Sequence, residues 1–396
     1  MLMTLLQDTS IKNIPLKMVY QTILQKGPIS RNDIIKETEL NRSKVVRLIQ
    51  QLVNQDLIYS YGEDVPHGGR PPVLFEVNAS ASYIVGVHII RMHVQVALYD
   101  IKGNEREHKQ IMLTQSHTST KVIDHIIQTI KEFLKKHAVS SHHFLGIGIG
   151  SIGPIDKQNG LILNPSFFPA PDWKAVPIVK ELKEHFHCKV LLEYGSNTAA
   201  LGEYIYEHSQ FNSLLYIMNA WNFGCGIISD RRLWHSRHGD VLSYGHMVVD
   251  IHGNLCRCGN RGCLVSYTSL PALLDNIQAE VSSIIEKENV HASHSSVNDI
   301  MRIFLSSHDT VQRIVLNSAE YLGIGAANLV NTIKPETVVL DGPLIHQHPS
   351  YYEKVVETAQ RYLFQDIDGT FQKASMPGKA ALIGASRLVL DSYFEL

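Results

Sequence analysis

Several features that define other classes of protein are missing from this sequence. It contains no run of eighteen consecutive apolar residues, so we expect no membrane-spanning helix. Its first residues, MLMTLLQDTSIKN, lack a cationic lead followed by an apolar core, so no secretory signal is predicted. Only five of its 396 residues are cysteines, an odd number that argues against a disulfide framework and indicates a reducing cytoplasm. The formal net charge of −2 means that any surface for nucleic acid must be local.

What is present is the composition of a soluble globular protein, with 44% hydrophobic and 19% charged residues. A chain of this length predicts two or three domains. We place the first domain boundary at residue 78, because short helical patterns give way to alternating strands and helices soon after it.

Residues 1–78 have the pattern of a winged helix-turn-helix. Apolar residues at helical spacing predict helices over 13–26, 31–38 and 42–54, and two short strands over 57–77 predict a wing. The third helix starts with small polar and cationic side chains, as the DNA-reading helix of such domains does. A Gly-Arg-Pro sequence in the wing suits an extended arginine in a minor groove. The expected contacts with double-stranded DNA are Arg42, Ser43, Lys44, Arg47 and Arg70.

The charge of this segment keeps a second interpretation open. Residues 1–78 hold nine lysines and arginines against eight aspartates and glutamates, a net charge of +1. Proteins that neutralise many phosphates usually present a clearly basic face. The domain could therefore bind DNA with modest affinity, or it could serve as a docking surface for another protein.

Three of the five cysteines fall within eight residues, with two glycines between the last two. A histidine stands ten residues before the first of them. Structural Zn²⁺ takes four thiolate or imidazole ligands in a tetrahedron, and glycines let the backbone turn tightly enough to bring them together. Inert buried cysteines are the alternative, but they would not explain the clustering. We predict a structural zinc knuckle with no position left for water; its ligands are His246, Cys256, Cys258 and Cys263.

From residue 83 onward, strands alternate with helices of 10–15 residues, which predicts α/β lobes with largely parallel sheets. Strands are expected over 84–90, 93–100, 144–149 and 190–193, and the second lobe opens near 214–218 and 224–229 and includes the apolar stretch 335–342. Helices are expected over 121–136, 176–186, 270–287, 296–305, 310–332 and 380–393.

The cysteine-rich stretch, G-H-x-x-V-D-x-x-G-x-x-C-x-C-G-x-x-G-C-L over residues 245–264, resembles the signature of the ROK family of repressors, open reading frames and sugar kinases. Y-L-G-I-G-A-A-N-L-V-N at 321–331 is similar to the family as well, and the resemblance covers nearly the whole chain. It implies a two-lobed actin-like fold of the ribonuclease-H type. The first lobe, over 79–205, would be an intermediate scaffold. The second, over 206–396, would hold the zinc knuckle and dimerisation helices.

The kinase chemistry that the resemblance implies is missing from the matching positions. ROK kinases place an aspartate as general base in a stretch similar to E-N-D-x-N-x-A-A-L-G-E, and this chain has Gly195 at that position. Glycine cannot accept a proton, and losing a positioned base costs about 10²–10⁴ in rate. The family's two phosphate loops correspond to residues 88–92 and 219–224, where branched and aromatic side chains fill the space. We therefore expect no enzyme activity.

The resemblance also implies a sugar pocket, in which polar contacts have been lost. The family contacts sugar hydroxyls through two glutamates, whose positions here hold Ser243 and Val265, and through an asparagine whose position holds Tyr194. Each polar group left unpaired costs roughly 1–3 kcal/mol. A sugar effector is therefore doubtful, although an unusual ligand such as a pentose is open. The residues of this degenerate pocket are Tyr194, Gly195, Ser243, His246 and Val265.

Two hypotheses for function follow. The first is a DNA-binding transcription regulator that acts through a protein partner, another repressor, in the manner of an antirepressor that regulates antibiotic resistance. The alternative is a sugar-responsive, xylose-type repressor that binds an operator. Both predict a cytoplasmic homodimer, because winged-helix regulators read paired half-sites. We expect the helices over 310–332 and 380–393 to form the dimer contact.

Overall fold

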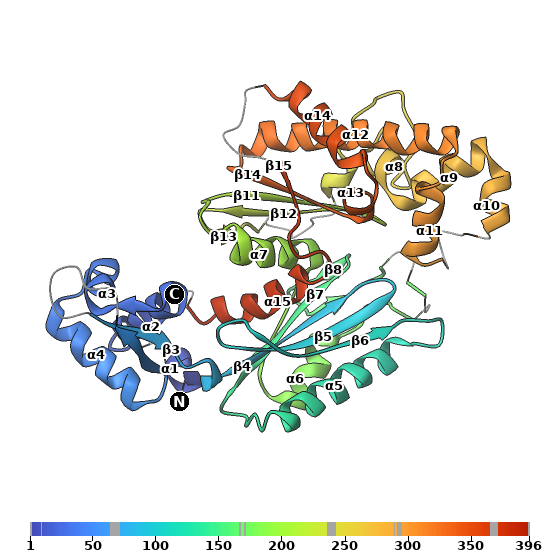
Figure 1. Ribbon diagram of the computed structural model, residues 1–396. Coiled ribbons are helices and arrows are strands. Elements are labelled where there is room, and N and C mark those ends of the chain that lie inside the picture. The colour runs from blue at the N-terminus through green and yellow to red at the C-terminus, as the bar shows by residue number, and fades with distance from the viewer. Residues whose placement is uncertain are drawn as a thin grey trace.

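In the computed structural model, an N-terminal domain is followed by two α/β lobes (Figure 1). The structure describes residues 2–8, 10–63, 72–165, 168–169, 172–235, 243–288, 290, 295–364 and 371–394. Among these residues, no helix is both long enough and apolar enough to cross a bilayer.

The N-terminal domain packs four helices against a small antiparallel sheet of order β1-β3-β2. Two of its helices start where side chains cap them. Ser30 Oγ accepts the backbone N–H of Asp33 at 3.2 Å, and Asn41 Oδ1 accepts that of Lys44 at 2.9 Å. The predicted helices are confirmed. The elements are α1 (Leu2–Gln7), α2 (Ile14–Lys26), β1 (Ile29–Ser30), α3 (Arg31–Thr38), α4 (Arg42–Asn54), β2 (Ile58–Glu63) and β3 (Val73–Val77).

The first lobe is built on a five-stranded sheet of order β10-β7-β4-β5-β6. Its strands β10, β7 and β4 run parallel, while β4, β5 and β6 form an antiparallel meander. The predicted strands over 84–90, 93–100 and 190–193 are confirmed. The elements are β4 (Tyr83–Ile89), β5 (His93–Asp100), β6 (Glu105–Met112), α5 (Ser119–Lys136), β7 (Phe144–Ser151), β8 (Ile155–Asp156), β9 (Leu161–Ile162), α6 (Ile178–Phe186), β10 (Lys189–Tyr194) and α7 (Gly195–Glu207).

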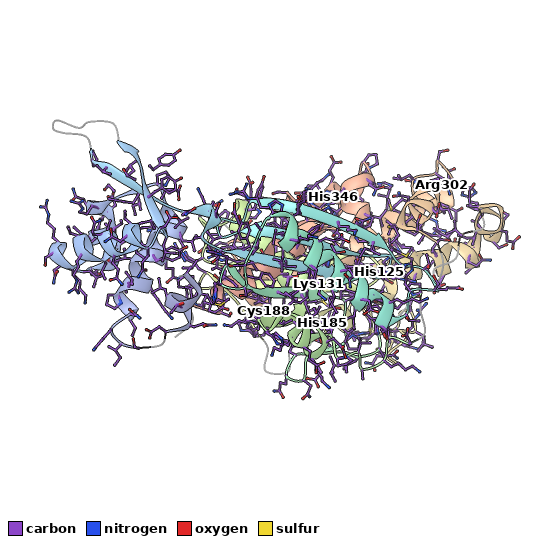
Figure 2. All side chains as sticks on the ribbon, turned by 90° about the horizontal axis from the view of Figure 1, so that it is seen from below. His125, Lys131, His185, Cys188, Arg302 and His346 are labelled. Atoms are coloured by element: carbon purple, nitrogen blue, oxygen red, sulfur yellow. The ribbon has the colours of Figure 1, made fainter. Side chains whose placement is uncertain are left out.

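Helices α5 and α6 cover one face of this sheet, as the view from below shows (Figure 2). The sequence of α5 explains its orientation, because its apolar residues recur at helical spacing and are buried against the sheet. His125 and Lys131 on α5, and His185 on α6, lie on the exposed side.

The second lobe has its own five-stranded sheet, of order β13-β12-β11-β14-β15, with the long helix α12 packed along α14 above it (Figure 1). The single helix predicted over 270–287 is wrong in one respect. Val281 adopts a non-helical backbone and divides it into α9 and α10. The elements are β11 (Leu214–Asn219), β12 (Phe223–Ser229), β13 (Arg232–Leu233), α8 (Val265–Thr268), α9 (Leu270–Glu280), α10 (Ser282–Glu288), α11 (Val297–Phe304), α12 (Asp309–Ile333), β14 (Thr337–Asp341), α13 (Pro343–Gln347), α14 (Tyr351–Tyr362) and β15 (Phe371–Lys373).

The C-terminal helix, α15 (Ala380–Asp391), returns to the first lobe and packs on α7, β4 and β7. Glycines allow the approach. A Cβ on Gly148 would lie 1.8 Å from the carbonyl oxygen of Ala385, and one on Gly384 would lie 1.7 Å from that of Thr198. Eight of the twelve residues of α15 are buried within the chain. The chain itself therefore covers most of α15, and the predicted part of this helix in a dimer contact stays a prediction.

The end of α15 also reaches the N-terminal domain, and the two chain ends lie on the same side of the molecule (Figure 1). Leu390 and Tyr393 share one hydrophobic cluster with Leu2 and Leu6 of α1 and with Leu145 of β7. The Tyr393 hydroxyl donates to the carbonyl oxygen of Leu145 at 2.8 Å. One apolar core thus joins the N-terminal domain to the first lobe.

Candidate functional site

The histidine and three cysteines of the predicted knuckle converge in the second lobe. All four potential ligand atoms, from His246, Cys256, Cys258 and Cys263, lie within 4.8 Å of one another. His246 Nδ1 is 3.6 Å from Cys256 Sγ, and the Sγ atoms of Cys258 and Cys263 are 3.6 Å apart. A tetrahedral ion with Zn–S bonds near 2.3 Å requires sulfur separations of about 3.8 Å. The donor set therefore fits Zn²⁺ with every position taken by protein.

Local backbone structure explains how these residues meet. The backbone N–H of Cys256 donates to Asn260 O at 2.8 Å, and that of Gly259 donates to Cys256 O at 2.9 Å. Gly262 has φ of +73°, and a Cβ there would lie 1.6 Å from the carbonyl oxygen of Asp250. Only glycine fits this position, so the glycine at 262 determines the turn that places Cys263 beside the other ligands.

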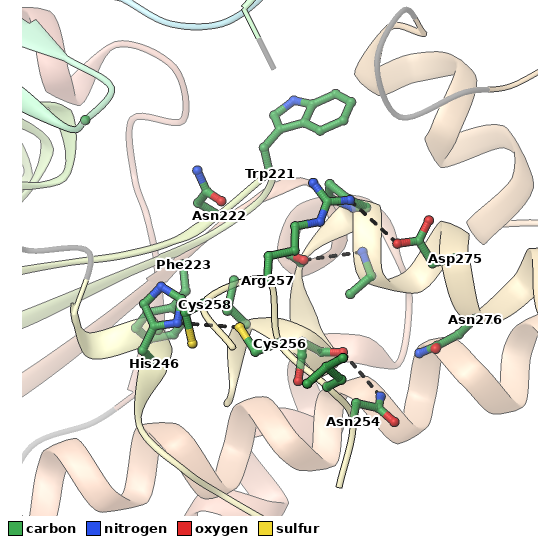
Figure 3. A pocket seen from close by; sticks show the side chains of 18 of the residues that line it. Trp221, Asn222, Phe223, His246, Asn254, Cys256, Arg257, Cys258, Asp275 and Asn276 are labelled. Atoms are coloured by element: carbon green, nitrogen blue, oxygen red, sulfur yellow. Dashed lines mark hydrogen bonds and ion pairs between the residues drawn. The ribbon is translucent and has the colours of Figure 1, made fainter. Parts of the chain in front are cut away.

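A cavity of about 560 Å³ opens beside the knuckle (Figure 3). Its volume lies in the range of small-molecule sites. The second lobe supplies most of its wall, and Gly153 and Pro154 of the first lobe close one side. The other lining residues are Trp221, Asn222, Phe223, Gly245, His246, Asn254, Leu255, Cys256, Arg257, Cys258, Val265, Ser266, Ser269, Pro271, Ala272, Asp275 and Asn276.

Neutral groups dominate this wall. Three asparagine amides (Asn222, Asn254 and Asn276) can donate and accept hydrogen bonds. Among the described lining residues, other than the knuckle ligands, Arg257 and Asp275 carry opposite charges; they lie 3.7 Å apart and both are largely exposed. The cavity thus offers amides and an aromatic wall, which suit a neutral polar ligand with an apolar face.

The predicted sugar-pocket residues are dispersed by the structure. His246 and Val265 line the cavity, and Ser243 is exposed at the start of the short 3-10 helix Ser243–His246. Tyr194 is 4% exposed and packs into the apolar cluster of the first lobe. Gly195 begins α7, where a Cβ would lie 3.2 Å from His88 Nε2.

The position that matches the family's general base is therefore walled by an imidazole. His88 is partly exposed, but its Nδ1 is buried. Burial, aided by the neighbouring His93, lowers the pKa of His88 to about 4. The imidazole is uncharged at neutral pH, so neither residue 195 nor residue 88 has an ionised side chain there.

Next to Tyr194, a buried carboxylate links the two lobes. Glu193 is 1% exposed, and its Oε1 accepts the N–H of Tyr194 at 2.9 Å and Nδ2 of Asn197 at 3.0 Å. Its Oε2 pairs with Lys157 Nζ of the first lobe and lies 3.4 Å from Nδ1 of His235, which follows β13. These contacts satisfy the carboxylate and connect the first lobe to the segment after β13.

The predicted DNA contacts lie at the start of α4. Arg42, Ser43 and Arg47 are exposed and Lys44 is partly exposed, while Val45 and Leu48 face the domain core. Ser43 Oγ donates to Asn41 Oδ1 at 3.0 Å. Arg70 lies outside the described residues.

Sequence reasoning missed several residues of the cavity wall. Asp275 and Asn276 stood in no motif, and no signal in the sequence marks them. Asn254 and Arg257 lie at variable positions of the 245–264 motif, close to the predicted ligands Cys256 and Cys258, so their place beside the knuckle could have been inferred. From the sequence, Trp221 was considered only as part of residues 219–224, which match one of the family's phosphate loops.

Comparisons with known proteins agree with this architecture. The sequence model described as "ROK family" matches residues 84–392. A xylose repressor of Bacillus spizizenii is 27% identical over 402 aligned residues, which cover 100% of this chain and 99% of the relative.

Two solved structures show the same fold. A ROK family transcriptional regulator, described as a homologue of the Escherichia coli MLC protein, has a TM-score of 0.77 at 24% identity and covers 97% of both chains. A ROK hexokinase from Thermus thermophilus has a TM-score of 0.67 at 24% identity and covers 78% of this chain and 99% of its own. The likeness confirms the predicted two-lobed α/β architecture.

Proposed function

The chain belongs to the ROK family, and from this premise we propose that it is a transcriptional repressor that binds double-stranded DNA and responds to a sugar. The observation that carries the proposal is that one apolar core joins the N-terminal domain to the first lobe and to the end of α15. The exposed cationic start of α4 lies in a domain that packs directly on α15 and β7. A xylose repressor aligns with the whole chain. This relative supports the sugar-responsive alternative better than the antirepressor hypothesis.

The DNA-binding part of the proposal rests on α3 and α4. Together with the turn at 39–41 they have the arrangement of a helix-turn-helix, with β2 and β3 as a wing. Arg42, Ser43, Lys44 and Arg47 would contact bases and phosphates, and Arg70 would extend from the wing. Because residues 1–78 carry a net charge of only +1, we expect a shallow dependence of affinity on salt.

The effector part rests on the cavity beside the knuckle. We infer a monosaccharide as the ligand, and D-xylose is the first candidate because the aligned relative is a xylose repressor. His246 and Val265 retain their places on the wall, while the amides of Asn222, Asn254 and Asn276 supply hydrogen bonds. Zn²⁺, when bound by His246 and the three cysteines, would hold this wall in place without taking part in chemistry.

A route connects the cavity to the DNA-binding domain. Helix α7 packs on β12, whose Phe223 lines the cavity, and α15 packs along α7. Near the C-terminal end of α7, Glu203 accepts the backbone N–H groups of Ser375 and Met376 at 3.1 and 2.8 Å, just before α15. Shifts of α7 would therefore move the α15 end that contacts α1.

The remaining features of the proposal follow from family and fold. The proposal includes no catalytic activity, because Gly195 occupies the position of the family's general base and the neighbouring His88 imidazole is uncharged. A repressor that reads paired half-sites would act as a homodimer in the cytoplasm, where DNA is accessible.

The test measures DNA binding by fluorescence anisotropy. DNA selected from a random pool by the full chain is titrated with protein, with and without D-xylose and a panel of other monosaccharides. We expect one sugar to weaken DNA binding by at least tenfold. Arg302→Ala, an exposed arginine on α11, serves as a charge-matched control for Arg47→Ala.

Two results would count against the proposal. Absence of DNA selection would remove the repressor function altogether. DNA binding that no sugar changes would remove the effector, and a second regulator that co-purifies and alters DNA binding would then support the antirepressor hypothesis.

A further inference from the structure

Two tight turns, one from each lobe, contact each other through their side chains. The turn between β4 and β5 carries Arg91, and the turn between β11 and β12 carries Trp221. The guanidinium carbon of Arg91 lies 3.7 Å from the centroid of the Trp221 ring, and the two side chains are 2% and 8% exposed. The contact joins residues 130 positions apart in the chain (221 − 91).

Backbone hydrogen bonds close both turns and set where the two side chains start. In the first, the N–H of Ile90 donates to His93 O at 3.1 Å. In the second, the N–H of Ala220 donates to Asn222 O at 3.1 Å, and Ala220 O accepts the N–H of Leu270 at 2.9 Å. This last bond ties the turn to the start of α9, which forms part of the cavity wall.

The Arg91 guanidinium stacked on Trp221 stays positively charged. Burial, and to a lesser degree Arg257, lowers the pKa of Arg91 to about 10, which still leaves the guanidinium protonated at neutral pH. A guanidinium over the face of an indole is attracted by the ring quadrupole, and the attraction is stronger when both groups are removed from water. Arg91 therefore holds the orientation of Trp221.

Trp221 contacts both Arg91 and the cavity. The indole receives Arg91 and also lines the cavity beside Asn222 and Phe223 (Figure 3). Among the described lining residues, those of the first lobe are Gly153 and Pro154, so Arg91 does not line the cavity. It influences the cavity through the tryptophan.

We propose that Arg91 is a positioning residue for the ligand cavity and a latch between the lobes. It fixes Trp221 as an aromatic wall for the apolar face of a sugar ring, and it holds the lobes together in the absence of ligand. The first half of this inference rests on the proposed sugar-binding function. The second half stands independently of it.

The latch is tested without ligand by labelling the full chain with 5-fluorotryptophan, which gives resonances for Trp173, Trp221 and Trp234. In Arg91→Met we expect the Trp221 resonance to move and broaden, while Arg91→Lys, which keeps a cation, restores much of the wild-type signal. Hydrogen exchange of residues 219–223 and 270–276 should rise at least tenfold in Arg91→Met. Arg302→Met on α11 is the control for loss of an arginine elsewhere.

The positioning role is tested with the sugar identified by DNA-release measurements. We expect Arg91→Met to weaken its binding about tenfold or more, and Arg91→Lys to recover most of that loss. An unchanged Trp221 resonance and unchanged exchange in Arg91→Met would overturn the latch. If no sugar binds the wild type, the sugar site fails, and the resonance and exchange measurements still decide whether the latch exists. If Arg91→Met does not fold, the Arg91→Lys spectrum and a Trp221→Phe exchange profile decide in its place.

Discussion

The knuckle and the neighbouring cavity are adjacent in space but were built in different ways. The four knuckle ligands come from eighteen consecutive residues, 246–263, and glycines with positive φ bring them together. The cavity takes its wall from segments that begin at Gly153 and end at Asn276, and its aromatic face is set by Arg91 from the other lobe. A site built from local turns can be read from spacing, whereas a site built from distant segments depends on how two sheets are packed. Four experiments test this contrast.

The largest effect is expected at the knuckle, because a metal ion bound by its four ligands would hold the loop together. Cys263→Ser should lower the free energy of unfolding by more than about 4 kcal/mol, since loss of a structural metal is among the few changes that cost this much. Thermal unfolding and zinc content per chain measure the change. Cys188→Ala, at a partly buried free cysteine of the first lobe, is the control. Equal stability with no zinc in the wild type would show that the cluster holds no metal.

The next largest effect is expected at Tyr393, which joins the end of the chain to Leu145 of β7 and to α1. Tyr393→Ala should cost about 3–5 kcal/mol, because a buried aromatic ring is lost and Leu145 O loses its donor. Tyr393→Phe, which removes only the hydroxyl, should cost about 1–3 kcal/mol. Urea unfolding measures both. DNA binding of the folded Tyr393→Ala protein should also weaken, and unchanged DNA binding would refute the route through α15.

A smaller effect concerns pH and His88. Burial lowers its pKa to about 4 in the folded protein, whereas the unfolded chain keeps the ordinary value of about 6.5. Between these values the unfolded state binds more protons, so stability falls as pH drops from about 6.5 towards 4, by at most about 3 kcal/mol. His88→Gln should flatten this part of the profile, and His125→Gln, exposed on α5, should not. The same slope in both variants would show that His88 is not the source.

The smallest effect is expected on DNA. Arg47→Ala should weaken binding by about 1 kcal/mol and, if its contact is to a phosphate, reduce the salt slope by about one. Anisotropy titrations at several salt concentrations measure both quantities. A loss that is the same for every DNA sequence would assign Arg47 to the backbone. A loss confined to one base position would assign it to sequence reading.

The helices and strands of the first lobe were predictable, because amphipathic periodicity reports directly on burial. Helix α5 shows this, with isoleucines recurring on one face and lysines on the other. The break at Val281 between α9 and α10 was not predictable, since the apolar pattern continues through it and only the backbone departs. The place of α15 was also hidden. Its small residues suit close packing, but nothing in its own sequence says which sheet it covers.

The sequence alone determined the family, the knuckle ligands and the exposed start of α4, because each depends on residues close together in the chain. The tertiary structure decided that Tyr194 turns into the core, that Gly195 faces His88, and that Arg91 stacks on Trp221. The contacts of Gly195 with His88 and of Arg91 with Trp221 join segments more than a hundred residues apart. Their geometry is set by the packing of whole sheets and helices, a property that no local pattern of residues encodes.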